Sequence, residues 1–415
     1  MRMKLFAGAT ALAVCLSGLS ASAAALKTLY SFCAPSSCNS GFDFVYYGPI
    51  LGQDGNLYGI TYGAGANKGG MVYQLVPNAD HSAWAFTDIH DFGGVEGAGY
   101  WPLSGLIQDA QGNLYGTTTS GGAHHEGQVF KLSKKGRTWK FASLYDFCPD
   151  EENCSDGMGP QGSLTYAGAA SGSPYDGTSP LYGIALGPGG GTNARVAFTL
   201  TPKGKTWKEK IIHGFGSDRL PNQGTLMVGA DGSLFGAHAV GDWTAFKLAP
   251  NAKHTKWKLH DFDAVGNDAN GDQIVDATGA MFGTTQSGFS NNGNVYKLDP
   301  GTGSVHVLYE FCALADCSDG KFSAGGMKLT GSGDLLGLTA VGGGHDIDIT
   351  GQGGGTIYKL HKGKLQTLYA FCAQSNCGDG EYPVSSPTLD ASGNVFGATA
   401  DGGANGGGTV FELVP

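Results

Sequence analysis

A short motif recurs seven times along the 415-residue chain. In each copy a pair of aromatic or aliphatic residues is followed by glycine, and successive glycines lie 47 to 67 residues apart. The copies are Leu57-Tyr58-Gly59, Leu114-Tyr115-Gly116, Leu181-Tyr182-Gly183, Leu234-Phe235-Gly236, Met281-Phe282-Gly283, Leu335-Leu336-Gly337 and Val395-Phe396-Gly397. Repeats of this length that carry several strand-length runs are typical of β-propeller blades. A unit of this size must stack on its neighbours to bury its apolar faces.

Each copy contains four strand-like segments. In the second copy they span 105–109, 113–118, 128–132 and 139–147. Turn-forming pairs such as Asp54-Gly55 and Asp231-Gly232 separate the first two segments, which therefore form a hairpin. We predict an all-β, seven-bladed β-propeller with four antiparallel strands per blade. A β-sandwich and a parallel β-helix are the alternatives, but a β-helix usually has a shorter repeat.

The two ends of the chain are out of phase with the repeat. Residues 29–32 match the fourth strand of other copies, whereas residues 409–413 match a third strand. The N-terminal strand is therefore expected to complete the last blade, which leaves no unpaired sheet edge at the seam. We accordingly assign residues 24–415 to a single seven-bladed propeller domain.

Four runs in the second copy carry a family resemblance. They are Gly112-Asn113-Leu114-Tyr115-Gly116-Thr117-Thr118, Gly121-Gly122, Val129-Phe130-Lys131-Leu132 and Leu144-Tyr145-Asp146-Phe147. These runs resemble the GloVer tandem repeat of Gloeobacter-like and Verrucomicrobia-like surface proteins, and similar runs cover essentially the whole mature chain. The resemblance implies the repeat but no catalytic residue set. Family members often end in a C-terminal sorting anchor that this chain lacks, so we expect a soluble secreted or periplasmic protein.

Residues 1–23 have the character of a secretory signal peptide. A basic start is followed by apolar or small residues from 5 to 19, and an Ala-Ser-Ala run at 21–23 offers a cleavage site. The residue before Cys15 is valine, where a lipoprotein signal needs a small residue. No later stretch reaches the roughly 20 apolar residues of a membrane helix. We expect an exported monomer without a membrane anchor.

The eight cysteines after Cys15 fall into four close pairs, each directly following a phenylalanine. The pairs are Cys33 with Cys38, Cys148 with Cys154, Cys312 with Cys317, and Cys372 with Cys377. We predict four local disulfides formed in an oxidising compartment. Zinc is the alternative, but paired thiols in four separate repeats do not form a compact four-ligand site.

The chain is acidic, with a formal net charge of −10. Nucleic acids and anionic membrane surfaces attract basic patches. Neither is therefore expected as a partner.

Propeller ligands usually bind on the face that carries the connections between strands two and three and between strand four and the next blade. Here these upper-face connections are long and variable, whereas the turns between strands one and two are expected to be short and uniform. Aromatic residues precede strand one in blades six, seven, one and two, which are neighbours in the ring. They include Tyr47, Tyr100, Trp101, Phe322 and Tyr382. Such rings stack on sugars, and packing against the neighbouring blade is the alternative.

Two arginines, Arg195 and Arg219, fall in upper-face loops of blades three and four. Their forked guanidinium groups suit carboxylates or sulfates, and plain surface solvation is the alternative.

Several histidines are candidate acid–base groups. His238 replaces a threonine found in other copies, Asp242 follows it, and His124 and His345 lie in the equivalent loops of blades two and six. A histidine beside a carboxylate can move protons near neutral pH, and a structural role is the alternative. A polysaccharide lyase could combine Arg195 or Arg219 with His238. A glycoside hydrolase would need two carboxylates, for which the candidates are Asp242, Asp346, Asp348 and Glu381.

One segment suggests a cation. Asp268, Asn270 and Asp272 alternate as in the first half of a calcium loop, but Gly279 stands where the later acidic ligand belongs. Calcium is the only cofactor that the sequence suggests.

Two functions of different classes are compatible with these features. The first is binding or cleavage of a polysaccharide at the mouth of the propeller channel. The second is a non-enzymatic scaffold that binds proteins at the cell surface or in the periplasm.

Overall fold

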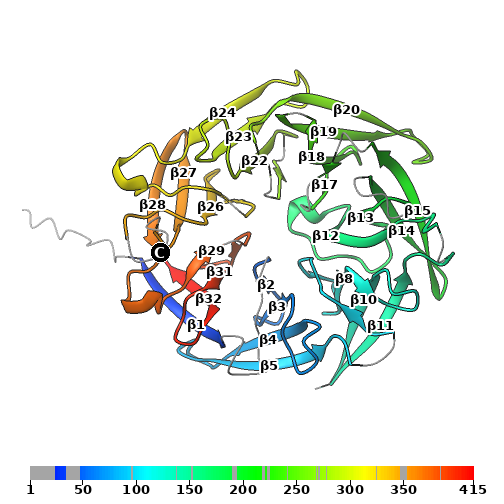
Figure 1. The fold of residues 1–415 in the computed structure, drawn as a ribbon, viewed down its shortest axis with the longest axis horizontal. Helices are drawn as coiled ribbons and strands as arrows, with labels where there is room; N and C mark the ends of the chain where they lie inside the picture. Colours follow the sequence, from blue (N-terminus) through cyan, green and yellow to red (C-terminus); the bar gives the residue numbers. More distant parts are fainter. Residues whose placement is uncertain are drawn as a thin grey trace, which may run out of the picture.

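The computed structural model describes most of the chain after residue 23. The described residues are 24–33, 47–94, 97–136, 138–150, 153–188, 194–216, 220–221, 225–240, 242–267, 269, 272–276, 278–323, 325–345, 353–383 and 385–415. Seven antiparallel sheets are arranged in a ring, with the first strands of the blades innermost (Figure 1). The predicted seven-bladed propeller is confirmed.

The first four blades follow one another around the ring, each written here from its inner to its outer strand. Blade 1 consists of β2 (Ile50–Leu51), β3 (Leu57–Thr61), β4 (Met71–Pro77) and β5 (Trp84–Asp91). Blade 2 consists of β7 (Ile107–Gln108), β8 (Leu114–Thr118), β10 (Gln128–Lys135) and β11 (Thr138–Asp146), and the short strands β6 (Gly99–Tyr100) and β9 (Ser120–Gly121) pair separately. Blade 3 consists of β12 (Met158–Tyr166), β13 (Leu181–Leu186), β14 (Arg195–Lys203) and β15 (Thr206–Phe215). In blade 4, β16 (Leu220–Pro221) and β17 (Met227–Val228) both pair with β18 (Leu234–Val240), followed by β19 (Asp242–Pro250) and β20 (Trp257–Ala264).

The remaining three blades complete the circle. Blade 5 consists of β21 (Ile274–Val275), β22 (Met281–Thr285), β23 (Asn294–Leu298) and β24 (Val305–Glu310). Blade 6 consists of β25 (Lys328–Leu329), β26 (Leu335–Thr339), β27 (Thr356–His361) and β28 (Lys364–Ala370). In blade 7, β29 (Glu381–Pro383) and β30 (Thr388–Leu389) pair with β31 (Val395–Asp401), followed by β32 (Gly406–Val414) and β1 (Ala25–Cys33).

The recurring glycine of the sequence motif has a packing reason. In blade 1, Gly59 lies opposite Tyr73 on the neighbouring strand, and a Cβ atom at Gly59 would come within 2.2 Å of the Tyr73 ring. Gly116 faces Phe130 in the same way in blade 2, at 2.7 Å. The second strand therefore needs glycine because the third strand places a buried aromatic ring across it. This pairing of glycine with an aromatic ring repeats in all seven blades.

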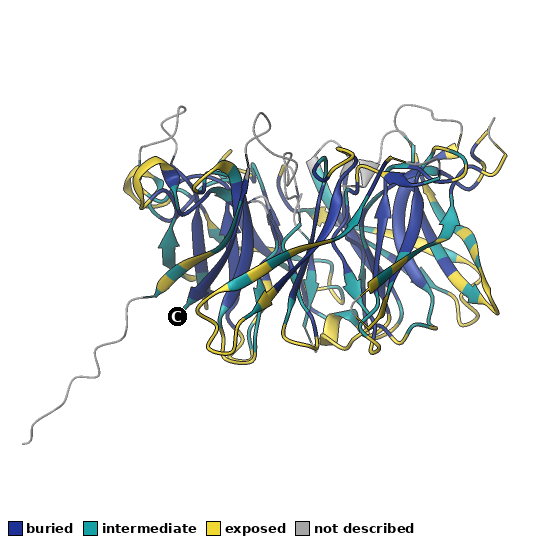
Figure 2. Cartoon of the chain, turned by 90° about the horizontal axis from the view of Figure 1, so that it is seen from below, coloured by how far each residue is buried: buried dark blue, intermediate teal, exposed yellow. Residues whose placement is uncertain are grey.

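The hydrophobic core is divided into clusters that lie between blades. One cluster joins Tyr58 and Val72 of blade 1 to Leu114 and Phe130 of blade 2, and each of the other six clusters also combines residues of two neighbouring blades. The buried strands lie in the middle of the ring, and the exposed residues gather in the connections on its two faces (Figure 2). Because each blade buries its faces against the next, the ring is stabilised as one unit.

The N-terminal strand closes the ring, as predicted. Strand β1 pairs antiparallel with β32, with Leu26 opposite Leu413, Thr28 opposite Phe411 and Ser31 opposite Thr409. The two strands lie side by side although they come from opposite ends of the chain (Figure 1). The outer edge of β32 is thereby covered.

The expectation of short and uniform turns between strands one and two is wrong for blade 3. Its connection, residues 167–180, contains a short 3-10 helix, η1 (Ala169–Ser171), and inserts Tyr175 between blades 2 and 3. The Tyr175 ring is fully buried and lies 5.2 Å from the Tyr115 ring and 5.1 Å from the Tyr166 ring. The connection is long because it adds core to this interface. Among the described residues, no helix is long and apolar enough to cross a membrane.

Candidate functional site

Three aromatic residues occupy one repeated position on the upper face, which carries the connections between strands two and three and between blades. Trp101, Phe322 and Tyr382 each lie six residues before the innermost paired strand that follows, in blades 2, 6 and 7. All three have a left-handed backbone, with φ of 56°, 58° and 56°. Their N–H groups donate to the preceding blade, to Gly69 O (2.8 Å), Asn292 O (2.8 Å) and Gly354 O (3.1 Å). We call these three residues the aromatic arc.

Blade 3 shows what the backbone alone would require at this position. Its equivalent residue is Gly159, with φ of 50° and an N–H donated to Glu126 O at 2.7 Å. Glycine adopts this conformation freely, whereas in other residues the conformation costs roughly 1–2 kcal/mol. Side chains kept in a left-handed conformation often belong to functional sites. The aromatic arc is therefore more than a consequence of the turn.

The exposed rings of this region offer flat surfaces to solvent. Trp101 is 45% exposed and stacks on Tyr62 with ring centres 6.2 Å apart and planes 20° apart. The preceding residue, Tyr100 of β6, is 36% exposed. Phe322 is half-buried, and the ammonium group of Lys321 lies 4.5 Å above its ring. Flat rings with adjacent polar groups suit the mixed polar and apolar faces of sugars.

Tyr47 was expected in the same region, but the structure places it deeper, on the channel wall. Its ring lies against Gly105, where an added Cβ would be 3.3 Å from Tyr47 Cδ1. Burial and the nearby charge of Asp272 raise the pKa of the Tyr47 hydroxyl well above its usual range. Tyr47 is therefore separate from the aromatic arc.

Several hydrogen bonds join equivalent positions of different blades along the channel at this level. They involve the equivalent residues Gly105, Ser163, Thr225, Asp272, Gly326 and Ser386. The N–H of one blade donates to the side chain of the next: Gly105 to Ser163 Oγ (2.7 Å), Thr225 to Asp272 Oδ1 (3.0 Å) and Gly326 to Ser386 Oγ (3.0 Å). The Ser386 hydroxyl then donates to Asp272 Oδ2 at 3.0 Å. These bonds hold the inner ends of the blades together.

Asp272 therefore has an architectural role that the calcium-like sequence pattern did not predict. Both of its carboxylate oxygens accept hydrogen bonds from other blades, Oδ1 from Thr225 of blade 4 and Oδ2 from Ser386 of blade 7. The other two residues of the pattern, Asp268 and Asn270, lie outside the described residues.

Of the two expected arginines, Arg195 is described and Arg219 lies outside the described residues. Arg195 begins β14, and its Nη1 donates to Gln161 Oε1 of the innermost strand of the same blade. Partial burial lowers the pKa of its guanidinium group. The structure thus turns Arg195 towards the inner part of blade 3.

His238, the first of the expected acid–base residues, lies in the interior of blade 4. It has no exposed surface, and its ring packs 5.1 Å from Phe246. Its Nε2 lies 3.0 Å from Asp261 Oδ1 on the outermost strand. The structure pairs His238 with Asp261, and no surface of its ring reaches the channel mouth.

The other candidate acid–base residues are dispersed. His124 and His345 are half-buried in upper-face connections of blades 2 and 6, and Glu381 begins β29 of blade 7. Asp242 begins β19, but its side chain lies outside the described part of the structure, as do Asp346 and Asp348. These described residues belong to blades 2, 6 and 7, whereas His238 is buried within blade 4.

Three of the four predicted disulfides are formed, each within its own repeat. They join Cys148 to Cys154, Cys312 to Cys317 and Cys372 to Cys377. The partner of Cys33 in the fourth prediction, Cys38, lies outside the described residues. Local disulfides of this kind are typical of proteins from oxidising compartments.

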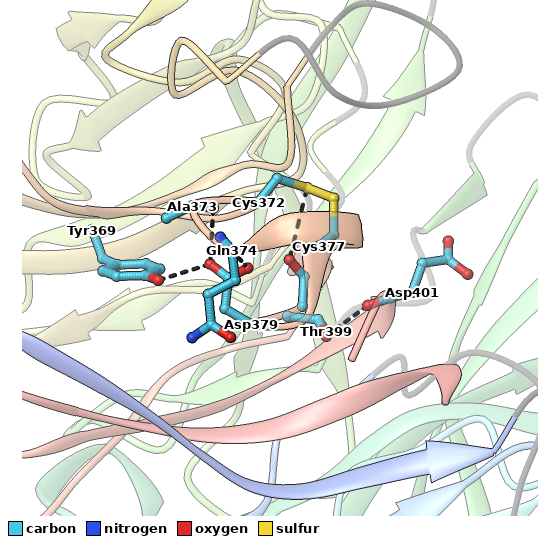
Figure 3. Close-up of a disulfide and its surroundings, with 9 residues drawn as sticks. Tyr369, Cys372, Ala373, Gln374, Cys377, Asp379, Thr399 and Asp401 are labelled. Carbon is cyan, nitrogen blue, oxygen red and sulfur yellow. Dashed lines mark hydrogen bonds between the residues drawn. A yellow bond between two sulfur atoms is a disulfide. The ribbon is translucent and has the colours of Figure 1, made fainter. Parts of the chain in front are cut away.

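A buried aspartate supports each of these disulfide loops, and sequence reasoning missed it. In blade 7, Asp379 has no exposed surface and accepts hydrogen bonds from the Tyr369 hydroxyl (2.7 Å) and from the N–H groups of Ala373 (3.1 Å) and Gln374 (3.2 Å) (Figure 3). In the loops that lead into blades 6 and 3, Asp319 and Asp156 likewise accept hydrogen bonds from a tyrosine hydroxyl and from backbone N–H groups of the disulfide loop. The signal was the aspartate-glycine pair that follows the second cysteine of each loop by two residues.

One group of residues has the right atoms for a metal but the wrong chemical state. Ligand atoms of Cys372, Cys377 and Glu381 lie within 4.8 Å of one another. The two sulfur atoms form a disulfide, so they lack the thiolate charge that binds a metal. The group does not fit a metal ion in this form.

A cavity of about 460 Å³ lies along the innermost strands near the lower face, opposite the aromatic arc. Its walls come from blades 1, 2, 6 and 7 and from the long connection of blade 3. They are mostly apolar, with Ile50, Leu51, Leu106, Ile107, Leu329 and Leu389 among the lining residues. Among the described residues that line it, Lys328 alone is charged.

Comparison with protein families agrees with this repeat architecture. The model of the Gloeobacter/Verrucomicrobia repeat matches residues 15–179 and 272–415, well over half of the chain. The chain belongs to this family. The matched residues include blades 1 and 7, which meet where the ring closes. This agrees with the family resemblance of the repeat motif. No curated protein sequence matches this Gloeobacter/Verrucomicrobia repeat protein.

Solved structures with the same fold have diverse activities. An oligogalacturonate lyase from Vibrio parahaemolyticus is 11% identical with a TM-score of 0.52, covering 95% of this chain and 97% of that one. An oligogalacturonate lyase in complex with manganese is 10% identical with a TM-score of 0.53, covering 94% and 96%. A fungal alcohol oxidase of the AA5 family, in complex with copper, is 16% identical with a TM-score of 0.54, covering 90% and 75%. Identities this low establish the propeller fold alone.

Proposed function

We propose that this Gloeobacter/Verrucomicrobia repeat protein binds carbohydrate through the aromatic arc on its upper face. The observation that carries the proposal is the repeated left-handed position of Trp101, Phe322 and Tyr382. Blade 3 has glycine there, so an aromatic ring is not needed for the turn itself. Blades 6, 7 and 2 lie on one side of the ring, separated only by blade 1 between blades 7 and 2. Rings presented along such an arc suit an extended polysaccharide better than a single small sugar.

The proposal is one of binding rather than of cleavage. His238, expected to act as an acid or base, has no exposed surface. The sugar would instead be held by stacking on aromatic rings. Oligogalacturonate lyases among the structures of similar fold are compatible with a carbohydrate partner.

We also propose that the protein works outside the cytoplasm, as a monomer released after removal of residues 1–23. The three disulfides within single loops support this proposal because they form and persist in oxidising compartments.

The test begins with a glycan array probed with the exported protein. The best glycan is then titrated by calorimetry against the unaltered protein and against Trp101→Gly, Phe322→Gly and Tyr382→Gly. Glycine keeps the left-handed backbone and removes only the ring. Losing one stacking ring should weaken binding about tenfold, which corresponds to about 1.4 kcal/mol.

Phe289→Ala is the matched control, because Phe289 is 54% exposed on blade 5 and lies outside the aromatic arc. Its affinity should stay within about twofold of the unaltered protein. An array without any bound glycan, together with a specific protein partner, would favour the scaffold function instead.

A further inference from the structure

The channel cavity has the size of a ligand pocket. Its volume of about 460 Å³ falls in the range of about 300–1,000 Å³ typical of sites for small molecules. Five blades contribute to its wall, including Gly172 and Pro174 from the long connection of blade 3. It lies on the opposite side of the ring from the aromatic arc, so its occupant is independent of the proposed carbohydrate.

The charged group that lines this cavity is the ammonium group of Lys328, and the residues around it are mostly apolar. The side chain of Lys328 is exposed to the channel. Protein nevertheless surrounds it on most sides, and this desolvation lowers the pKa of its ammonium group, although Asp272 acts in the opposite direction. Within the described part of the chain, no carboxylate lies within salt-bridge distance of Lys328.

Asp272, the carboxylate whose charge acts on Lys328, already accepts hydrogen bonds from other residues. Both oxygens of Asp272 accept hydrogen bonds, from Thr225 and Ser386, so two other blades hold this carboxylate in place. Lys328 therefore offers a positive charge that an anion entering the cavity could approach. A charge that is partly desolvated gains more from such a partner than a charge in bulk water.

The polar side chains of the wall favour an acceptor on the ligand. Gln108 uses its Oε1 to accept the N–H of Gln53 at 3.0 Å, which leaves its NH2 group as a donor. Gln53 in turn donates its own Nε2 to Asp109 O at 3.1 Å. The cavity thus combines an ammonium group and an amide donor with leucine and isoleucine walls.

We infer that this cavity binds a small organic acid, with its carboxylate at Lys328 and its aliphatic or ring body against the apolar wall. A neutral ligand of the same shape would lose the charge interaction. An amine would be repelled by Lys328.

Three probes of one shape test the inference: hexanoate, hexanol and hexylammonium, each titrated by calorimetry into the exported full-length mature protein at neutral pH. Hexanoate should bind at least tenfold more tightly than hexanol, and hexylammonium should not bind. Equal binding of hexanoate and hexanol, or no binding of hexanoate, would overturn the inference. This comparison needs no variant and therefore does not depend on the folding of one.

Lys328→Met then tests whether the charge of Lys328 causes the preference for the anion. It should abolish the preference for hexanoate over hexanol, whereas Lys364→Met, at an exposed position on the outermost strand of the same blade, should leave it unchanged. A preference that survives in Lys328→Met would also overturn the inference. Trp101→Gly should not affect hexanoate binding. The hexanoate test and the glycan test can therefore fail independently of each other.

Discussion

Replacing Phe32 by alanine tests whether the N-terminal strand is an integral part of blade 7. Phe32 on β1 is 1% exposed, and its ring lies 4.9 Å from Tyr30 and 5.5 Å from Tyr73 of blade 1. Truncating a fully buried phenylalanine removes its transfer free energy and leaves a cavity, which together cost about 3–5 kcal/mol. Phe32→Ala should therefore lower the free energy of unfolding by that amount.

Phe147→Ala is the matched control for this measurement. Phe147 has no exposed surface and lies after the fourth strand of blade 2, the position equivalent to Phe32, with its ring 5.2 Å from Phe198 of blade 3. Urea denaturation followed by tryptophan fluorescence gives both free energies. If the N-terminal strand closes the ring, the two substitutions should cost the same within about 1 kcal/mol. A cost below about 1 kcal/mol for Phe32→Ala, beside a full cost for Phe147→Ala, would refute the closure.

Three further predictions concern the loops and the blade interfaces. Asp379→Asn should lower stability by at least about 2 kcal/mol in thermal unfolding, because it places an amide where the Tyr369 hydroxyl and two backbone N–H groups donate, and a neutral effect would contradict this role. Burial and the nearby Asp156 raise the pKa of Glu209 to about 8 from 4.5, so the folded state holds a proton that the unfolded state releases. The free energy of unfolding should therefore decrease as the pH rises from 4.5 to 8. Glu209→Gln should remove on the order of 1–2 kcal/mol of this decrease, a value that allows for solvent screening. An unchanged pH profile in Glu209→Gln would argue against a protonated Glu209 in the folded state. Non-reducing peptide mapping should find every disulfide within one repeat, including Cys33 with Cys38, and because each loop contributes only about 2 kcal/mol, reduction should lower the melting temperature modestly; a peptide that joins two blades would contradict the assignment.

The fold was predictable because its signal is repeated. The glycine after each aromatic pair marks a strand that faces a bulky ring, as at Gly59 and Tyr73, and seven copies of one constraint leave few alternatives. The phase of the two chain ends predicted closure for the same reason. The long connection of blade 3 was missed, since its buried Tyr175 occurs once and follows no repeat.

The candidate site was less predictable because it depends on contacts between blades. The equivalent placement of Trp101, Phe322 and Tyr382 was visible in the sequence, but their left-handed backbone was not. His238 was a candidate acid–base group because it replaces a threonine of the other copies and Asp242 follows it, yet its ring is packed beside Phe246 in the blade interior. Asp272 resembled a cation ligand, but its partners Thr225 and Ser386 come from other blades, and their proximity follows only from the closed ring.

The most direct test of the proposed function is a crystal structure of the exported protein with an oligosaccharide taken from the glycan array. The account predicts sugar rings stacked on Trp101, with further contacts to Tyr382 or Phe322 along the upper face. An oligosaccharide bound in the lower channel cavity, or on the outer strands with the aromatic arc free, would contradict it.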